Sequence, residues 1–170
     1  MLKMNQFEVI RSKIITVNDL PSKLAYWRFK SMKIVFTNCC FDILHAGHIE
    51  YLAKAASEGD ILIIGLNTDQ SVRKLKGMHR PINDENARAL IMASLSFVGA
   101  VVLFDEDTPY NLIKLIQPDV LIKGSDYNPE NIVGYDILMA KKGEVKTIDF
   151  VPGYSTTAIE QKIFNNLSGK

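Results

Sequence analysis

The sequence predicts a doubly wound α/β fold, in which a parallel sheet of about five strands lies between two layers of helices. Short, nearly continuous apolar runs recur along the chain, and such runs are typical of strands buried on both faces of a parallel sheet. Segments with helical spacing separate them, and strands that alternate with helices favour right-handed crossovers. The predicted strands are 33–37, 61–66, 100–104, 120–122 and 145–148. Together these features indicate a Rossmann-like, three-layer α/β/α domain.

Residues 1–32 are predicted to form a helical extension ahead of the main domain, residues 33–170. Leu20, Leu24 and Trp27 fall on one face of a helix within this extension. No internal repeat or linker divides the remainder, so we expect a single domain overall.

Four helices are expected after the first strand, and three of them carry a specific expectation. In the second, the inner side is predicted to hold Leu90, Ile91, Ala93 and Leu95. In the third, a capping residue precedes Pro109 in the first turn. In the last, 157–160 matches a capping box. The expected helices are 49–56, 84–96, one opened by 107–109 and one from 155.

Composition and charge exclude several classes of protein. The 170 residues are 47% hydrophobic and 23% charged, and the formal net charge is +1. Near-neutrality argues against a nucleic-acid binder, yet permits a local positive cluster for a small anionic ligand. The sequence has no apolar run of membrane-spanning length and no signal peptide. The cysteines, Cys39 and Cys40, are adjacent and poorly placed to form a disulfide. We therefore expect a cytoplasmic protein with reduced thiols, and apolar residues in the first thirty positions suggest a homo-oligomer.

Polar residues follow four of the predicted strands. In open α/β sheets, ligands bind beyond the carboxyl ends of the strands, where the strand order reverses. The loops 38–48, 67–69, 123–127 and 153–157 all lie at that edge. Their convergence predicts a ligand site there.

The segment His45-Ala46-Gly47-His48 links the first strand to the first helix. Histidines three apart at a helix start share one face, so both imidazoles reach the same ligand. Amides at a helix N-terminus already favour a phosphate, and Gly47 removes a side chain where a nucleotide approaches the backbone. The alternative is that one histidine caps the helix and the other is solvated. A zinc site with Cys39 and Cys40 is disfavoured, because neighbouring strand residues point to opposite sides.

Three further charged residues leave their roles open. Asp42 either holds magnesium, orients a substrate hydroxyl or forms a turn. The basic segment 73–80 is either solvated surface or a lid in which Lys76, beside Gly77, covers bound phosphates. Arg88, within a predicted helix, is expected to be an exposed charge.

Ser155, Thr156 and Thr157 begin the last predicted helix. They are either a well-capped helix start or a second phosphate-binding N-terminus. The sequence contains neither G-x-G-x-x-G nor G-x-x-x-x-G-K-[ST], which counts against dinucleotide dehydrogenases and P-loop enzymes.

Residues 37–42, leading to 45–48, resemble the signature of the cytidylyltransferase-like nucleotidyltransferases. The 155–157 helix start resembles the second signature of that superfamily. The similarity extends from about Lys33 to Ile163.

Within the superfamily, the chain most closely resembles the adenylyltransferases of ADP-heptose synthesis. Residues 75–77 with 80–81, 106–109 and 123–127 favour this branch. The glycerol-phosphate cytidylyltransferase branch usually has an arginine shortly before its Ser-Thr-Thr, whereas this chain has Phe150-Val151-Pro152 there.

The resemblance implies transfer of AMP from ATP to D-glycero-β-D-manno-heptose 1-phosphate, with Mg²⁺ as cofactor and pyrophosphate as second product. A separate heptose kinase is expected to supply the sugar phosphate. His45, His48 and Lys76 would be catalytic, and Asp42 would lie near the sugar phosphate or metal. The implied nucleotide- and phosphate-binding residues are Thr37, Asn38, Cys39, Cys40, Phe41, Gly47, Arg88, Lys123, Gly124, Asp126, Tyr127, Ser155, Thr156 and Thr157.

Cys39 stands where the family normally has glycine. A side chain there is costly if the position needs positive φ or contacts phosphate, so either the loop is shifted or activity is altered. Two other functions therefore stay open: cytidylyl transfer to glycerol 3-phosphate or another phosphoalcohol, and nucleotide binding without turnover.

Overall fold

The computed structural model describes residues 4–125, 128–149 and 151–169. Its sheet has five parallel strands in the order β3-β2-β1-β4-β5, which confirms the predicted Rossmann-like, doubly wound fold. The strands closely match the predicted segments, although the structure extends the first and fourth by two residues at their carboxyl ends. Their bounds are β1 Ile34–Cys39, β2 Ile61–Asn67, β3 Ala100–Phe104, β4 Val120–Gly124 and β5 Glu144–Ile148.

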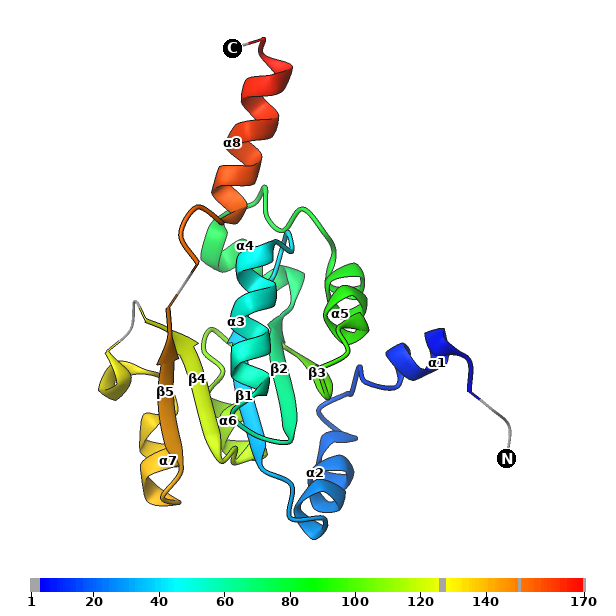
Figure 1. Ribbon diagram of the computed structural model, residues 1–170, viewed down its shortest axis with the longest axis vertical. Coiled ribbons are helices and arrows are strands. Elements are labelled where there is room, and N and C mark those ends of the chain that lie inside the picture. The colour runs from blue at the N-terminus through cyan, green and yellow to red at the C-terminus, as the bar shows by residue number, and fades with distance from the viewer. Residues whose placement is uncertain (1–3, 126–127, 150, 170) are drawn as a thin grey trace.

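Helices cover both faces of this sheet (Figure 1). One core joins α2, α6 and α7 to one face, and a second core joins α3 and α5 to the other. Burial on both faces explains why the strands are nearly continuous apolar runs. The helices are α1 Gln6–Arg11, α2 Leu20–Phe29, α3 Ala46–Ala56, α4 Asp69–Lys76, α5 Glu85–Ser94, α6 Tyr110–Ile116, the 3₁₀ turn η1 Pro129–Asn131, α7 Tyr135–Ala140 and α8 Thr156–Leu167.

The N-terminal extension packs on the sheet instead of standing apart from it. The predicted face of α2 is buried through Leu20, Leu24 and Trp27. Between α1 and α2, the chain pairs with the edge strand β3: the Ile15 N–H donates to the Val101 carbonyl at 2.9 Å, and the Val101 N–H donates to Lys13 at 2.8 Å. The extension therefore protects part of an exposed sheet edge.

The inner face of α5 differs from the prediction. Its buried residues are Arg88, Ala89, Met92 and Ala93, whereas Ile91 is 36% exposed and Leu90 and Leu95 are only half-buried. The prediction placed Leu90 and Ile91 inside because they are apolar. In the structure they lie on the flank of the helix, and Arg88 takes a core position.

The caps of two helices differ from the prediction, although the last helix does start at Ser155 as expected. Pro109 is the N-cap of α6 and no side chain caps that helix, so Thr108 lies outside it. In α8, the Ser155 hydroxyl accepts from the Ala158 N–H at 3.0 Å, so the helix begins before the expected capping box. Glu160, the acidic residue of that box, instead pairs with Arg80.

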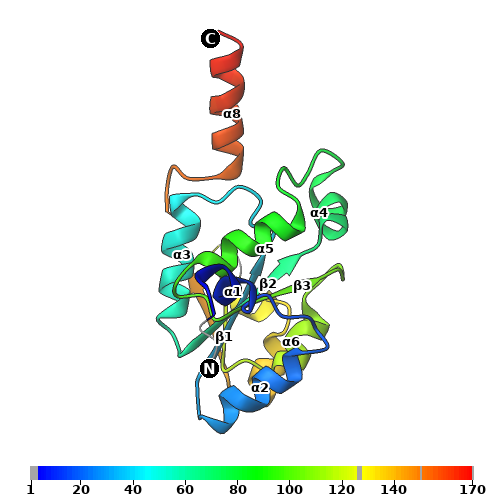
Figure 2. The same ribbon diagram turned by 90° about the vertical axis from the view of Figure 1, so that its right-hand side faces the viewer.

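The last helix stands away from the rest of the molecule (Figures 1 and 2). α8 buries none of its residues, and Ile163, Phe164 and Leu167 are more than half exposed. Among the described residues, no helix combines the length and apolar character needed to cross a bilayer.

Candidate active site

A crevice opens at the carboxyl edge of the sheet between β1 and β4, where the strand order reverses. β1 stays paired with β2 as far as Cys39↔Leu66, but its pairing with β4 ends at Phe36↔Leu121. Beyond that point the two strands separate. This is the position at which open α/β sheets bind ligands.

Two side chains bridge the separated strands in place of backbone hydrogen bonds. The Tyr51 hydroxyl lies 2.7 Å from the Thr37 hydroxyl and donates to the Ile122 carbonyl at 3.3 Å. The Lys123 ammonium donates to the Asn38 carbonyl at 3.2 Å. Thr37, Asn38 and Lys123 were predicted site residues, and the structure places all three at this crevice.

His45 is the N-cap of α3, and its Nδ1 accepts from the His48 N–H at 3.3 Å. Because Nδ1 is the acceptor, the proton of the neutral ring lies on Nε2, which is left as a donor. The capping and the ligand-binding interpretations of His45 are therefore compatible, since they use different nitrogens.

His48 stacks on His45, with ring centroids 3.7 Å apart and planes at 17°. The Phe41 ring contacts it edge-on at 5.1 Å. Burial, and then the charges of His45 and Lys76, lower the pKa of His48 to about 4, although a backbone hydrogen bond with Ile43 acts in the opposite direction. Both rings are thus neutral near pH 7, because burial lowers the pKa of His45 as well.

One nitrogen of His48 lacks a partner within the described structure. Nδ1 is buried and makes no hydrogen bond, and the only other such side-chain atom among the described residues is Asn38 Oδ1. Buried polar atoms are nearly always paired in native proteins, so this nitrogen keeps a hydrogen-bonding site for a water molecule or a bound ligand.

The start of α8 lies against the start of α3. A Cβ added to Gly47 would meet the Tyr154 Cβ at 3.0 Å and His45 Nδ1 at 3.1 Å. The Tyr154 ring also lies nearly parallel to His45, with centroids 6.5 Å apart. Glycine at position 47 thus permits the two helix starts to meet. Ser155, Thr156 and Thr157 follow directly, which brings both predicted phosphate-type segments to one place.

Arg80 connects three segments around these helix starts. Its guanidinium contacts the Asp42 carboxylate at 2.7 Å and also pairs with Glu160 of α8. Asp42 accepts in addition from the Ile82 N–H at 2.7 Å and the Asn83 N–H at 3.0 Å. These bonds reach residues about forty positions away, so they are not the local turn that the sequence left open for Asp42, and the metal or sugar role stays a prediction.

The electrostatics of Asp42 follow from the same contacts. Burial acts to raise the pKa of this carboxyl, but the hydrogen bonds from Asn83, Arg80 and Ile82 outweigh it and hold the pKa below its ordinary value. Asp42 is therefore a buried carboxylate anion that fixes the loop after Arg80.

Lys76 ends α4, directly before Gly77, whose φ is 93°. Its charge acts to lower the pKa of both His48 and the Cys40 thiol. The net pKa of Cys40 is nevertheless raised, chiefly by burial.

Arg88 is fully buried, so the expected exposed charge is wrong. Its guanidinium donates to the Asn83 carbonyl at 3.0 Å, to the Cys40 carbonyl at 2.7 Å and to Asp69 at 2.7 Å. These bonds tie the β1–α3 loop to the start of α4. Sequence reasoning missed this role because cations in amphipathic helices are almost always exposed unless paired.

Cys39 causes no backbone strain. It lies within β1, and positive φ occurs instead at Phe41, where φ is 43°. Cys40 is buried, with its Sγ 3.8 Å from Asn67 Oδ1. Among the described residues, no group of three or more His, Cys, Asp or Glu side chains is arranged to hold a metal ion.

The loop after β4 is only partly described. Lys123 and Gly124 end β4 at the crevice, whereas the predicted site residues Asp126 and Tyr127 lie outside the described residues. Arg80 and Tyr154 are contacts that the sequence analysis missed, because ion pairs and ring stacking between distant loops leave no local pattern.

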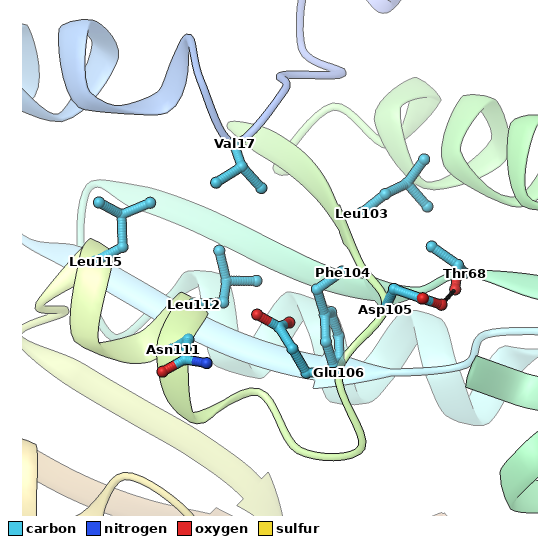
Figure 3. A pocket seen from close by; sticks show the side chains of 9 residues that line it. All are labelled: Val17, Thr68, Leu103, Phe104, Asp105, Glu106, Asn111, Leu112 and Leu115. Carbon is cyan, nitrogen blue, oxygen red and sulfur yellow. Dashed lines mark hydrogen bonds between the residues drawn. The ribbon is translucent and has the colours of Figure 1, made fainter. Parts of the chain in front are cut away.

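A separate cavity of about 400 Å³ lies at the outer edge of β3, by α6 (Figure 3). Its walls include Val17, Leu112 and Leu115, and a hydrogen bond joins Thr68 to Asp105 at its border. Asp105 and Glu106 make it acidic, and its described lining holds no cation, so it does not suit a nucleotide phosphate.

A doubly wound sheet with two helix N-termini and a pair of imidazoles at the switch point defines a nucleotide-binding protein that handles phosphate groups. Residues 36–162 match the family described as Cytidylyltransferase-like, and the chain belongs to this family of nucleotidyltransferases.

Relatives and solved structures agree with that membership. The chain is 51% identical to the bifunctional protein HldE of Wolinella succinogenes over 153 residues, covering 90% of this chain and 31% of the relative. It is 57% identical to the bifunctional protein HldE of Campylobacter concisus over 131 residues, covering 77% and 27%. The chain thus spans about a third of the length of these relatives.

Two solved structures share the fold. The lipopolysaccharide core biosynthesis protein from Thermoplasma volcanium is 28% identical, with a TM-score of 0.56 over 71% of this chain and 97% of that chain. Pantoate-β-alanine ligase from Francisella tularensis is 18% identical, with a TM-score of 0.53 over 91% and 78%, which is a likeness of fold alone.

Proposed function

We propose that this chain transfers AMP from ATP to D-glycero-β-D-manno-heptose 1-phosphate, giving ADP-heptose and pyrophosphate. The observation that carries the proposal is the meeting of two phosphate-type helix starts, at His45–His48 and Ser155, beside the β1–β4 crevice. The acceptor follows from the resemblance to heptose-phosphate adenylyltransferases and from the similarity to HldE proteins.

In the proposed reaction, an oxygen of the sugar phosphate attacks the α-phosphorus of ATP. The bond from that phosphorus to the oxygen bridging to the β-phosphorus breaks, and its electron pair leaves with pyrophosphate. Negative charge then grows on the leaving group. The two imidazole N–H groups and the Lys76 ammonium supply donors and positive charge there, and the first-turn amides of α8 bind the terminal phosphates.

Magnesium fits this site only as a partner of the nucleotide. Asp42 is the buried carboxylate of the β1–α3 loop, and Arg80 and two backbone N–H groups already occupy it. The phosphate oxygens are therefore the ligands we expect to hold Mg²⁺, which readily keeps several waters. The ion would neutralise phosphate charge during transfer.

The other expected properties belong to the same proposal. The acceptor is a phosphorylated sugar, so a heptose kinase must supply it. A cytoplasmic location and a homo-oligomer stay predictions, as does the division into an extension of 1–32 and a catalytic domain of 33–170.

A pyrophosphate-release assay tests the proposal. ATP and CTP are each paired with heptose 1-phosphate and with glycerol 3-phosphate. Release with ATP and heptose 1-phosphate, at least a hundredfold faster than with the other pairs, is the expected result. Preferred release with CTP would establish cytidylyl transfer instead. Binding of ATP without release from any pair would make the chain a nucleotide-binding module.

A further inference from the structure

The last helix presents an apolar face to solvent. α8 buries none of its 12 residues, although Ile163, Phe164 and Leu167 are large, apolar and more than half exposed. The helix also stands away from the sheet (Figures 1 and 2). A helix of this length is only marginally stable in water by itself. We therefore expect another surface to cover these three side chains, which are called the α8 face below.

The α8 face is directed toward one other segment of the chain. Glu160 of α8 forms an ion pair with Arg80, which lies in the 77–82 loop after α4. The three residues of the α8 face follow Glu160 by three, four and seven positions. Residues with this spacing share one side of a helix. The α8 face is thus on the side of the helix that the 77–82 loop approaches.

The 77–82 loop exposes apolar side chains on both sides of Arg80. Met78 precedes this arginine by two residues, Ile82 follows it by two, and both are more than half exposed. Leu75, near the end of α4, is exposed to a similar extent. Exposed apolar side chains that gather in one place mark a surface for contact with another surface. The loop and the α8 face are therefore matched partners around an ion pair that is already formed.

Each segment is joined to the domain through a glycine in open space. Gly153 precedes α8 with a φ of 84°, and Gly77 begins the loop with a φ of 93°. No neighbouring group lies within 4 Å of the position that a Cβ would take at either glycine. Hinges of moving loops and lids are a few such positions, which absorb the change in backbone angles. Both segments can therefore move without repacking the core.

The base of each segment carries a group that the proposed function assigns to phosphates. Ser155 begins α8, and its hydroxyl accepts from the Ala158 N–H, which leaves the earlier N–H groups of the first turn for a phosphate. Lys76 directly precedes Gly77. A triphosphate that contacts both bases would draw the two segments together.

We infer that ATP binding closes α8 onto the 77–82 loop, so that Ile163 and Phe164 pack against Met78 and Ile82 beside the bound phosphates. This inference rests on the proposed function, because it takes ATP as the ligand of the crevice, but it does not depend on the acceptor. Closure of this kind excludes water and holds the bound substrate in place. It also gives the α8 face a partner within the same chain.

Tryptophan fluorescence tests the closure directly. Trp27, the only tryptophan of the chain, is buried in α2 and gives a constant background. In a Phe164→Trp variant, a non-hydrolysable ATP analogue is expected to shift the emission to shorter wavelength and to lower acrylamide quenching by about twofold or more, because the indole ring leaves water. Phe29→Trp is the matched control, since position 29 is also exposed but lies on α2, and no change is expected there.

A double-mutant cycle tests whether the two surfaces meet. Phe164→Ser and Ile82→Ser are each expected to weaken binding of the ATP analogue about three- to tenfold, because each removes one side of the same contact. The double variant is expected to bind no more than about twofold worse than either single variant. Phe29→Ser should bind as the wild type does. Circular dichroism checks that each variant folds, and Met78→Ser takes the place of Ile82→Ser if that variant does not.

Three outcomes would overturn the inference. The first is unchanged quenching of Phe164→Trp at a saturating concentration of the analogue, and the second is fully additive losses in the double variant. The third is shielding of the introduced tryptophan without nucleotide that increases with protein concentration, because a second copy of the chain would then cover α8.

Failure of the proposed function can be recognised separately. In that case the analogue closes α8 as expected, but no pair of nucleotide and acceptor releases pyrophosphate. A chain that does not bind the ATP analogue at all would overturn both the proposed function and the closure.

Discussion

The two helix starts that meet at the crevice are held in opposite ways. The start of α3 is built into the domain: His45 and His48 stack on each other, Phe41 contacts His48, and Gly47 is buried. The start of α8 follows Gly153, at φ 84° with open space around it, and the helix buries no residue. The contacts that hold it here are the Tyr154 stack on His45 and the ion pair from Glu160 to Arg80.

This difference predicts a division of labour, in which α3 acts in the chemical step and α8 acts in nucleotide binding. Groups on α3 are preorganised, so they can stabilise charge that develops during transfer without first being ordered. The position of α8 depends on few contacts, so part of the binding energy of the nucleotide must be used to fix it. Changes at α3 should therefore lower kcat, and changes at α8 should mainly raise the KM for ATP.

The largest expected effect is that of His48→Ala. Removing one preorganised donor should lower kcat by about a hundredfold or more, with a smaller change in the KM for ATP. Steady-state pyrophosphate release measures both constants. His48→Gln keeps a side-chain donor and should recover part of the loss. Near-normal turnover in His48→Ala would remove the histidine from the transition state.

The stacked histidines should also make the fold sensitive to acid. The pKa of His48 is about 4 in the folded chain and 6.5 in the reference state. Above pH 6.5 the ring is neutral in both states. Between pH 6.5 and 4 the unfolded chain binds a proton that the folded chain does not, so stability falls as pH falls.

The size of that loss is on the order of 2 kcal/mol, after allowing for the partial exposure of the ring. It corresponds to a decrease of about 5 °C in Tm for a chain of this size. Thermal unfolding from pH 7 to pH 4 measures it, with His48→Gln as the comparison. Equal slopes for the two proteins would mean that His48 is not the group responsible.

The smallest effect is expected from Glu160→Gln, which removes the charge that ties α8 to Arg80. Arg80 keeps its buried partner Asp42, so the loop that carries Arg80 stays in place. Because partly exposed ion pairs contribute about 0–1 kcal/mol, the KM for ATP should rise two- to fivefold and kcat should change little. Glu50→Gln breaks the exposed Glu50–Lys54 pair on α3 and is the matched control. A fall in kcat without a change in KM would contradict the division of labour.

Elements with strong local patterns could be predicted from the sequence. Apolar runs predict the buried strands, and residue spacing predicts the helix start at His45. The parallel sheet then places the loops that follow the strands at one edge. The cap at Ser155 was harder to place, because Ser155, Thr156 and Thr157 all carry a hydroxyl that can cap a helix. The inner face of α5 was harder because the burial of Arg88 depends on tertiary contacts.

Arg88 and Arg80 show where sequence reasoning ends. Nothing in the neighbourhood of either arginine indicates whether its partners are water or distant loops. Arg88 is buried because the Cys40 carbonyl and Asp69 receive its hydrogen bonds, and both come from other parts of the chain. The orphaned oxygen of Asn38 is likewise visible only once β1 and β4 are known to separate.

The early end of the β1–β4 pairing also bears on how the whole domain holds together. At the carboxyl edge, the sheet is two half-sheets, β3-β2-β1 and β4-β5, joined by Tyr51 and Lys123 instead of a ladder of backbone bonds. A ligand that contacts both half-sheets bridges the gap between β1 and β4. Its binding free energy then adds to the free energy needed to separate the two half-sheets, so a bound substrate stabilises the domain itself.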